Sequence, residues 1–365
     1  MTKVAVDIPG EKSYEVFIES DLLPFVGQDL RKIDSNPRAL IITDQVVQNL
    51  YLETLKRSLE QASYFVSVIT VPSGEQAKSL ECAGEIWHAM HECKLNRDSL
   101  VIALGGGVVG DLAGFTGSTF MRGLRIVQVP TTLLAMVDSS VGGKTAINLE
   151  TGKNLVGTFC QPIAVYADLD TLVSLPEREW ACGCAEIVKS SVIDSDDFFF
   201  WMVEHASELV ERDLRVVKEA VRRSVSFKAS VVIRDQEETE NVRECLNYGH
   251  TLAHAIETEA GYGVYSHGHA VAQGMRFAAR LGAAHLGTSF TFVSAQDSLL
   301  DELDLPELSF KASPERLLEL MLGDKKVRSN KLRFVLPKDI GVWEICELEN
   351  EFVLEHLKAW QKSIA

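Results

Sequence analysis

The chain of 365 residues is 46% hydrophobic and carries a formal net charge of −16 at pH 7, so it is long enough for two domains of about 150 residues each. The acidic balance excludes general affinity for nucleic acid or for anionic membrane surfaces. An anionic small molecule is compatible with this charge only where lysines and arginines gather locally.

The first 176 residues alternate between strand and helix patterns. Alternating apolar residues predict a hairpin of strands at 3–8 and 14–20. Beyond it we expect strands at 39–44, 64–71, 99–104 and 125–130, separated by helices at 46–62, 78–93 and 108–120. Strands that alternate with helices predict a doubly wound, mostly parallel, Rossmann-like sheet.

After Pro176 the pattern becomes helical. Apolar residues recur at helical spacing in the segments 177–193, 196–211, 214–233, 246–275 and 314–322. We therefore predict an NAD-binding α/β domain over residues 1–176 and a mainly α-helical domain, binding metal and substrate, over residues 177–365. The active site would lie in the cleft between them.

The termini and cysteines indicate a cytoplasmic protein. The N-terminal residues lack a basic region followed by an apolar core, and no stretch approaches the roughly 18 apolar residues of a membrane span. The seven cysteines are an odd number without Cys-x-x-Cys spacing. We expect reduced thiols in the cytoplasm.

A glycine-rich turn follows the strand at 99–104. Glycines 105–107 and 110 precede and open a helix. This context suits a dinucleotide pyrophosphate, because glycine lets the backbone approach and the N–H groups at a helix start face negative charge. An ordinary tight turn is the alternative. No acidic residue that could hydrogen-bond the ribose of the cofactor follows about twenty positions later, so we expect a variant dinucleotide site. Glu75 and Lys78, at another strand end, either contact the cofactor or cap a helix.

A second polar cluster follows the strand at 125–130. It contains Asp138, Lys144, Lys153 and Asn154 in a glycine- and serine-rich stretch that we expect to be a loop. Its Gly-Gly-Lys-Thr sequence lacks the four-residue spacer to an earlier glycine, which excludes a nucleotide triphosphatase loop. The lysines are either surface residues or contacts to the phosphate of a phosphorylated polyol, with the aspartate on its hydroxyls.

Four of the nine histidines lie between residues 246 and 275. His250 and His254 share a helix face, whereas His267 and His269 alternate, so that only one of the latter pair points inward. Glu186 adds a carboxylate upstream. Two histidines and one glutamate form an established catalytic zinc set with an open position for substrate. A satisfied core or surface histidine is the alternative, and spacing does not settle which three residues bind metal.

Together these motifs resemble the 3-dehydroquinate synthases, members of the sugar-phosphate cyclase family. The resemblance rests on "GGGVVGDLAGF", "VPTTLLAMVDSSVGGKTAIN", "AEIVK", "LNYGHTLAHAIE" and "HGHAVAQGM", and it extends from Asp44 to Pro337. It implies a cytosolic homodimer that depends on NAD and on Zn²⁺, with Co²⁺ as an alternative. The implied reaction converts 3-deoxy-D-arabino-heptulosonate 7-phosphate into 3-dehydroquinate and phosphate in the shikimate pathway of aromatic amino acid biosynthesis.

The resemblance also assigns site residues by position. Arg122 would reach the phosphate site of the partner subunit. The implied metal ligands are Glu186, His250 and His267. The implied substrate contacts are Arg122, Asp138, Lys144, Asn154, Lys228, Arg243, Asn247, His254 and Lys326, which is favoured over Lys325. The residues implied to serve catalysis are Lys144, Lys189, Glu238, Arg243 and His254. The implied cofactor contacts are Asp44, Glu75, Lys78, Gly106, Gly107, Asp111, Thr131, Thr132, Asp138, Lys153 and Glu179.

The family's chemistry uses NAD catalytically. NAD would oxidise one carbinol while zinc polarises its oxygen, which acidifies the neighbouring C–H. Phosphate would leave by elimination after taking that proton itself. NADH would then return the hydride, and ring opening with intramolecular aldol closure would complete the carbocycle. The site would chiefly position and polarise its substrate.

Some positions depart from the family pattern. Residues 190–191 are Ser-Ser instead of Tyr-Gly, residues 252–253 are Leu-Ala instead of a bulky residue and glycine, and His269 replaces a glutamate. We interpret His269 as a surface residue.

Three competing functions are a cyclase for sedoheptulose 7-phosphate or glucose 6-phosphate, a metal-dependent polyol dehydrogenase, and an inactive binding protein. Arg243 and Asn247, with His254, favour a carboxylated substrate, because a buried arginine without its anion is costly.

Overall fold

The computed structural model describes residues 1–10, 13–261, 264–309, 312–323 and 331–364. They form two compact units. Unit 1 comprises Met1–Pro176 and Lys228–Glu237, and unit 2 comprises Glu177–Phe227 and Glu238–Ala365. The segment from Lys228 to Glu237 groups with unit 1, which helical periodicity alone did not indicate. The assignment of NAD to one domain and of metal to the other stays a prediction, as does an active site between them.

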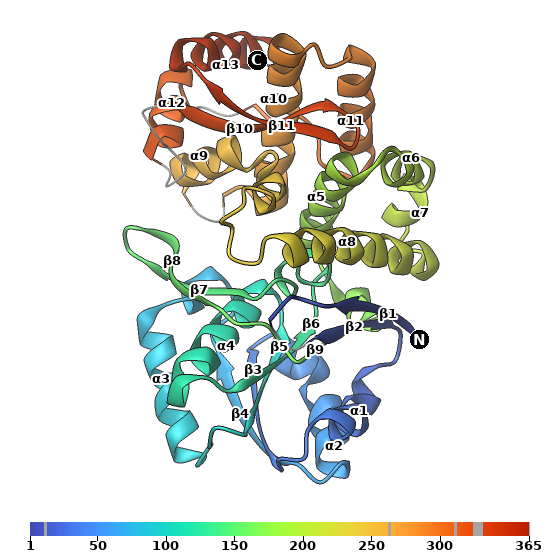
Figure 1. The fold of residues 1–365 in the computed structure, drawn as a ribbon, viewed down its shortest axis with the longest axis vertical. Helices are drawn as coiled ribbons and strands as arrows, with labels where there is room; N and C mark the ends of the chain where they lie inside the picture. The colour runs from blue at the N-terminus through green and yellow to red at the C-terminus, as the bar shows by residue number, and fades with distance from the viewer. Residues whose placement is uncertain (11–12, 262–263, 310–311, 324–330, 365) are drawn as a thin grey trace. The chain divides into compact units, whose positions relative to one another are not determined.

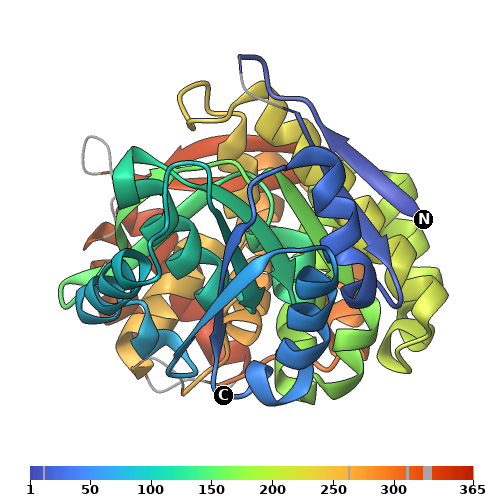
Figure 2. The same ribbon diagram turned by 90° about the horizontal axis from the view of Figure 1, so that it is seen from below.

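Unit 1 contains a seven-stranded sheet in the order β1-β2-β9-β6-β5-β3-β4 (Figures 1 and 2). The first strand pairs antiparallel with the second, as predicted, and the other neighbouring strands pair in parallel. The strands are β1 (Thr2–Val6), β2 (Tyr14–Glu19), β3 (Arg38–Asp44), β4 (Phe65–Val71), β5 (Leu100–Gly105), β6 (Arg125–Pro130) and β9 (Ala164–Asp168).

Helices cover both faces of this sheet. On β5, Leu100, Ile102 and Leu104 point to a core shared with α1 and α2, whereas Val101 and Ala103 point to a core shared with α3 and α4. Burial on both faces explains the nearly continuous apolar strands and confirms the doubly wound sheet. The helices and short turns are η1 (Leu23–Phe25), α1 (Val26–Ile33), η2 (Gln48–Leu52), α2 (Glu53–Gln61), η3 (Glu75–Ala77), α3 (Leu80–Glu92), α4 (Gly107–Thr119), η4 (Phe120–Arg122) and η6 (Leu169–Ser174).

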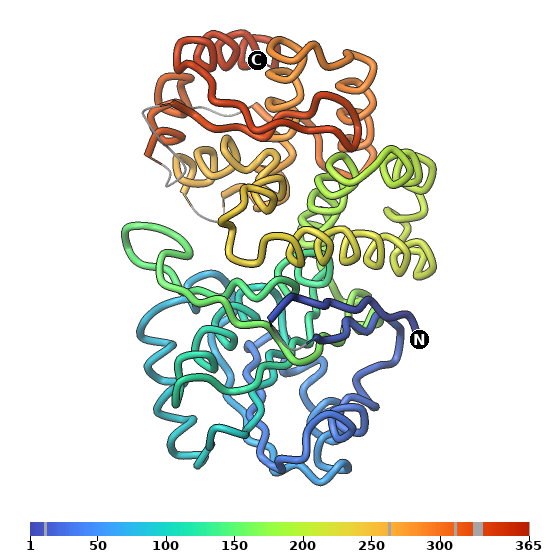
Figure 3. The backbone as a smooth tube through the Cα atoms, in the orientation of Figure 1, coloured from blue at the N-terminus to red at the C-terminus, as the bar shows by residue number. Residues whose placement is uncertain are grey.

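The predicted loop after residue 130 is wrong in part. The chain forms a π-helical turn, η5 (Ala135–Ser139), and then an antiparallel hairpin of β7 (Lys144–Leu149) and β8 (Gly152–Phe159), traced in green in Figure 3. Gly142 and Gly143, in the turn just before β7, have φ 98° and 68°. Gly157 of β8 instead allows close strand pairing, because a Cβ there would overlap the carbonyl oxygen of Thr145.

Unit 2 is mainly helical, as predicted, and also contains a two-stranded sheet. No helix in the described ranges is long and apolar enough to cross a membrane. The helix α8 continues into unit 1 from Lys228 onwards. The elements are α5 (Glu177–Asp194), α6 (Asp196–Glu204), α7 (Ala206–Val210), α8 (Leu214–Arg234), η7 (Arg243–Asn247), α9 (His250–Ala260), α10 (His267–Leu286), α11 (Phe290–Glu302), α12 (Pro314–Gly323), β10 (Leu332–Asp339), β11 (Val342–Leu348) and α13 (Asn350–Ser363).

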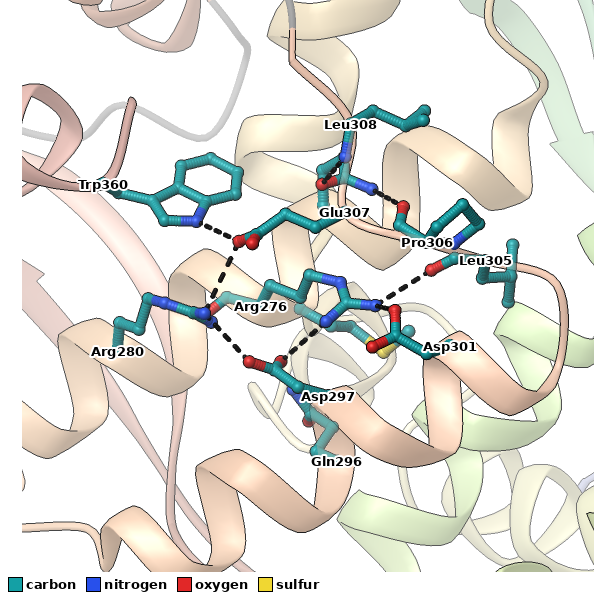
Figure 4. A network of polar contacts seen from close by, with 12 residues as sticks. Arg276, Arg280, Gln296, Asp297, Asp301, Leu305, Pro306, Glu307, Leu308 and Trp360 are labelled. Carbon is teal, nitrogen blue, oxygen red and sulfur yellow. Dashed lines mark hydrogen bonds and ion pairs between the residues drawn. The ribbon is translucent and has the colours of Figure 1, made fainter. Parts of the chain in front are cut away.

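The central helix of unit 2 is α10, which packs against α5, α9, α11 and β10. An ion-pair network around the buried Arg276 fixes it to α11 (Figure 4). Arg276 pairs with Asp297 at 3.2 Å and with Asp301 at 2.6 Å, and it donates to the carbonyl of Leu305 at 3.0 Å. Arg280 pairs with the same Asp297 at 2.9 Å. Because a buried charge is costly when unpaired, these partners hold α10 in one position.

Candidate active site

Most of the predicted cofactor residues of unit 1 gather at one edge of the sheet. Four neighbouring parallel strands, β6, β5, β3 and β4, end there. Ligands of open α/β sheets bind outside the carboxyl ends of the strands. The residues at or just after these strand ends are Asp44 on β3, Glu75 and Lys78 after β4, Gly106, Gly107 and Asp111 after β5, and Thr131 and Thr132 after β6.

The glycine turn packs closely against the segment after β6. Gly106 is the N-cap of α4 and Gly107 is its first residue. A Cβ on Gly106 would lie 3.0 Å from Thr132 Cγ2, and one on Gly107 would lie 2.9 Å from Ser139 Oγ. The turn is therefore both tight and placed at a helix start, where free backbone N–H groups suit a pyrophosphate.

Lys78 is the centre of a polar cluster in unit 1. Its side chain is 5% exposed, and Nζ donates to Asp111 Oδ2 at 2.6 Å and to Asn154 Oδ1 at 2.5 Å. Burial raises the pKa of the Asp111 carboxyl, and the ammonium group of Lys78 opposes this shift. The contacts bring a predicted substrate residue, Asn154, against Lys78, a predicted cofactor residue that also pairs with Asp111.

A second pair in unit 1 joins Lys228 of α8 to Asp138 of η5. Lys228 Nζ donates to the carbonyl oxygen of Asp138 at 2.6 Å and also pairs with its carboxylate. Both side chains are predicted to contact substrate, and the structure places them in direct contact. Lys144, at the start of β7, and Arg122, in η4, are exposed, whereas Lys153 is half-buried.

Unit 2 brings together Glu186 of α5 and the first residues of α9 and α10, His250 and His267. Glu186 is 1% exposed, and its Oε1 has no hydrogen-bond partner among the described residues. This oxygen lies 3.6 Å from His250 Nε2 and 3.5 Å from His267 Nε2. Tetrahedral zinc ligands lie about 3.3 Å apart. The donor atoms and their spacing therefore fit a divalent cation.

The other ring nitrogen of each histidine faces an acceptor. His267 Nδ1 lies 3.3 Å from Glu257 Oε2, and His250 Nδ1 lies 3.1 Å from the carbonyl oxygen of Tyr248. A proton on each Nδ1 leaves the Nε2 lone pairs directed at Glu186, as metal-binding histidines require. Burial lowers the pKa of His267, but Glu186 and Glu257 outweigh it and raise the pKa to about 10.

Two glycines of α10, Gly268 and Gly274, let these elements approach it. Gly249 has φ 80°, and a Cβ on Gly274 of α10 would overlap the carbonyl oxygen of Gly249. A Cβ on Gly268 would overlap Cys182 Cα of α5. The start of α9, which carries His250, and helix α5 can therefore lie directly against α10.

Comparison with known proteins decides the family. Residues 68–182 match the family model described as 3-dehydroquinate synthase N-terminal, and residues 183–327 match the one described as 3-dehydroquinate synthase C-terminal. The chain belongs to the 3-dehydroquinate synthase family. A 3-dehydroquinate synthase from Rhodopirellula baltica is 45% identical over 338 residues, which cover 91% of this chain and 90% of that protein. The predicted resemblance is confirmed.

Two solved structures share the fold of this chain. The crystal structure of 2-deoxy-scyllo-inosose synthase complexed with carbaglucose-6-phosphate, NAD+ and Co2+ has a TM-score of 0.89 at 24% identity, with 98% of this chain and 100% of that chain covered. The 2-epi-5-epi-valiolone synthase from Streptomyces hygroscopicus subsp. jinggangensis, with NAD+ and Zn2+ bound, has a TM-score of 0.88 at 26% identity, with 98% and 99% covered.

The remaining residues predicted from the 3-dehydroquinate synthase pattern vary in their surroundings. Lys189 is buried and pairs with Glu186, one turn away on α5. The ring of His254 lies edge-on to that of His250, with centroids 5.7 Å apart. In η7, Arg243 is buried and Asn247 is half-buried. Glu179 and Glu238 are both exposed. Lys325 and Lys326 lie outside the described residues.

His269, a departure from the 3-dehydroquinate synthase pattern that we interpreted as a surface residue, is half-buried. Its Nδ1 lies 2.6 Å from the hydroxyl oxygen of Ser266, the N-cap of α10. The side chain therefore takes part in capping the helix that carries His267.

Sequence reasoning missed Glu257 and Tyr248. Glu257 lies three residues after His254 and seven after His250, which places it on the same face of α9. That spacing could have identified the carboxylate. The contribution of Tyr248 is a backbone carbonyl, for which side-chain patterns give no signal.

Proposed function

We propose that this chain is a carbon–oxygen lyase that converts 3-deoxy-D-arabino-heptulosonate 7-phosphate into 3-dehydroquinate and phosphate. The observation that carries the proposal is the family match across both halves of the chain. It is supported by Glu186, His250 and His267, whose ligand atoms all lie within 4.8 Å of one another.

Unit 2 would hold the divalent cation through Glu186, His250 and His267. Lys189, beside Glu186 on α5, would donate to a substrate hydroxyl near the cation. When bound, NAD accepts and returns a hydride and the cation polarises the oxygen of the same substrate carbon. The protein contributes by holding the reacting groups in place, which lowers the entropic part of the barrier.

Unit 1 would bind NAD at the carboxyl ends of β3 to β6 and hold the substrate phosphate. Lys144 and Asn154 would bind the phosphate, and Asp138 and Lys228 would bind hydroxyls. The contact between Asn154 and Lys78 supports neighbouring sites for phosphate and cofactor. A firmly held phosphate is consistent with the family chemistry, in which it accepts the proton during its own elimination.

The proposed assembly and location follow from the family resemblance. A homodimer would let the exposed Arg122 reach the phosphate site of a second copy. All seven cysteines are free, which is compatible with the cytoplasm. Light scattering after size-exclusion chromatography tests the dimer.

Phosphate release tests the activity. Purified protein with NAD and Zn²⁺ should release inorganic phosphate from the heptulosonate phosphate without net formation of NADH. NADH accumulation with glycerol would indicate a polyol dehydrogenase instead.

The second candidate is a cyclase for another sugar phosphate, because both solved structures above carry the names of such enzymes. Turnover of sedoheptulose 7-phosphate in place of the heptulosonate phosphate would favour it. Arg243, which is buried, is among the residues that the family resemblance assigns to a substrate carboxylate, and this assignment favours the heptulosonate phosphate.

A further inference from the structure

The β7–β8 hairpin contains an irregularity at its predicted binding residues. Ile147 pairs with Val156 and Leu149 pairs with Gly152, so that Asn148 alone faces the three residues 153–155. Asn154, in the middle of this bulge, has φ 54°, a left-handed conformation that asparagine adopts more readily than most residues with a side chain. Bulges re-aim side chains near functional sites and persist where neighbours hold them.

Asn148 holds the bulge with its side-chain amide. The backbone N–H of Asn154 donates to Asn148 Oδ1 at 2.9 Å, and Asn148 Nδ2 donates to Glu75 Oε1 at 2.8 Å. The partners fix the orientation of the amide, because a backbone N–H only donates and a carboxylate only accepts. The backbone N–H of Asn148 also donates to the carbonyl of Lys78 at 2.8 Å.

These contacts close a ring of hydrogen bonds. Lys78 Nζ donates to Asn154 Oδ1 at 2.5 Å, so that Asn154 is held from its backbone by Asn148 and from its side chain by Lys78. Glu75 and Lys78 belong to the proposed NAD site, and Asn154 belongs to the proposed phosphate site. The side-chain amide of Asn148 contacts both sites, through Glu75 on one side and Asn154 on the other.

We propose that Asn148 is a positioning residue that fixes Asn154 and Glu75 relative to each other and thereby couples substrate-phosphate binding to NAD binding. This inference rests on the proposed function. Coupling between two ligands is reciprocal, so NAD should tighten phosphate binding by the same factor as phosphate tightens NAD binding.

Two substitutions separate the two hydrogen bonds. Asn148→Asp keeps the acceptor for Asn154 but places a carboxylate against Glu75, and it should raise the Kd for NAD about tenfold. The Kd for inorganic phosphate, measured without NAD, should change by less than about threefold in this variant. Asn148→Ala removes both bonds and should raise both Kd values about tenfold, and the Kd for phosphate should no longer depend on NAD.

A double variant tests the pairing directly. Asn148→Asp combined with Glu75→Gln exchanges the amide and the carboxylate, so a hydrogen bond can form in the opposite direction. The effects of the two substitutions on the Kd for NAD should therefore be non-additive. Thr151→Ala, at the exposed tip of the same hairpin, is the matched control and should leave both Kd values unchanged.

The inference is overturned if Asn148→Asp and Asn148→Ala bind NAD and phosphate as the wild type does, or if both variants only lower the melting temperature. Additive effects in the double variant would also contradict it. Because binding is measured without turnover, different results contradict the proposed function and the proposed role of Asn148. Wild-type protein that does not bind NAD contradicts the proposed function, whereas normal binding by the variants contradicts only the role of Asn148.

Discussion

Glu257 Oε2 lies 3.3 Å from His267 Nδ1, and on the opposite side of the imidazole Nε2 lies 3.5 Å from Glu186 Oε1. The side chain of Glu257 is 9% exposed, so this carboxylate meets the ring away from bulk water. Because the Glu257 carboxylate accepts a hydrogen bond, it favours the His267 tautomer with the proton on Nδ1. That tautomer presents the Nε2 lone pair to a cation.

Loss of the Glu257 carboxylate should therefore weaken cation binding. We expect Glu257→Gln to lower the affinity for Zn²⁺ about 10- to 100-fold, measured by titrating metal-free protein in competition with a chromophoric chelator. Glu259→Gln is the matched control, because Glu259 lies on the same helix but is exposed and pairs with Arg316. Equal affinities in the two variants would show that Glu257 does not orient the ring.

Cation binding should strengthen as the pH rises. Glu186 and Glu257 raise the pKa of His267 to about 10 despite its burial, so in the metal-free protein the ring carries a proton on both nitrogens at pH 7. A metal ligand must be deprotonated, and the cation therefore has to displace this proton. The apparent affinity for Zn²⁺ should rise by about tenfold per pH unit for one displaced proton between pH 6.5 and 8.5. A pH-independent affinity measured with the same chelator would contradict this displacement.

The histidines at 250 and 269 should behave differently when removed. His250→Ala takes one nitrogen from the proposed cation site and should abolish both Zn²⁺ binding and phosphate release. His269→Ala removes the side-chain contact to Ser266 but keeps the capping hydrogen bond from the backbone N–H of residue 269, so it should keep the metal and cost about 1 kcal/mol of stability. Metal content by atomic emission and urea unfolding distinguish the two effects. A similar loss of metal in both variants would overturn the proposed ligand set.

Much of the fold follows from local sequence patterns. Runs such as Leu100–Gly105 are apolar at every position because both faces of the strand are buried, and their alternation with helices predicts the parallel sheet. The β7–β8 hairpin was missed because its glycines and polar residues are typical of loops. Gly157 allows the close approach of the two strands, and this approach depends on tertiary structure.

The candidate site could be predicted only in outline. The spacing of His250 and His254 indicates a shared helix face but not which ring meets Glu186, since that depends on how α5, α9 and α10 pack. Family resemblance supplied the choice of His250 and His267. Asn148 was missed because its contacts join segments far apart in the sequence.

Gly274 should be essential for the cation site, although it is not a ligand. A Cβ at this position would overlap the carbonyl oxygen of Gly249, immediately before His250, so α10 and the start of α9 would have to separate. We expect Gly274→Ala to lower the free energy of unfolding by about 3 kcal/mol and to weaken Zn²⁺ binding by displacing His250.

Gly84→Ala provides the matched control for Gly274→Ala. Gly84 also lies inside a helix, α3, but a Cβ there meets nothing within 4 Å. Because alanine is the better helix former, this variant should gain up to about 1 kcal/mol and keep its metal affinity. Urea unfolding and Zn²⁺ titration of the two variants measure both quantities. Normal metal affinity in Gly274→Ala would show that the contact between α9 and α10 does not set the position of His250.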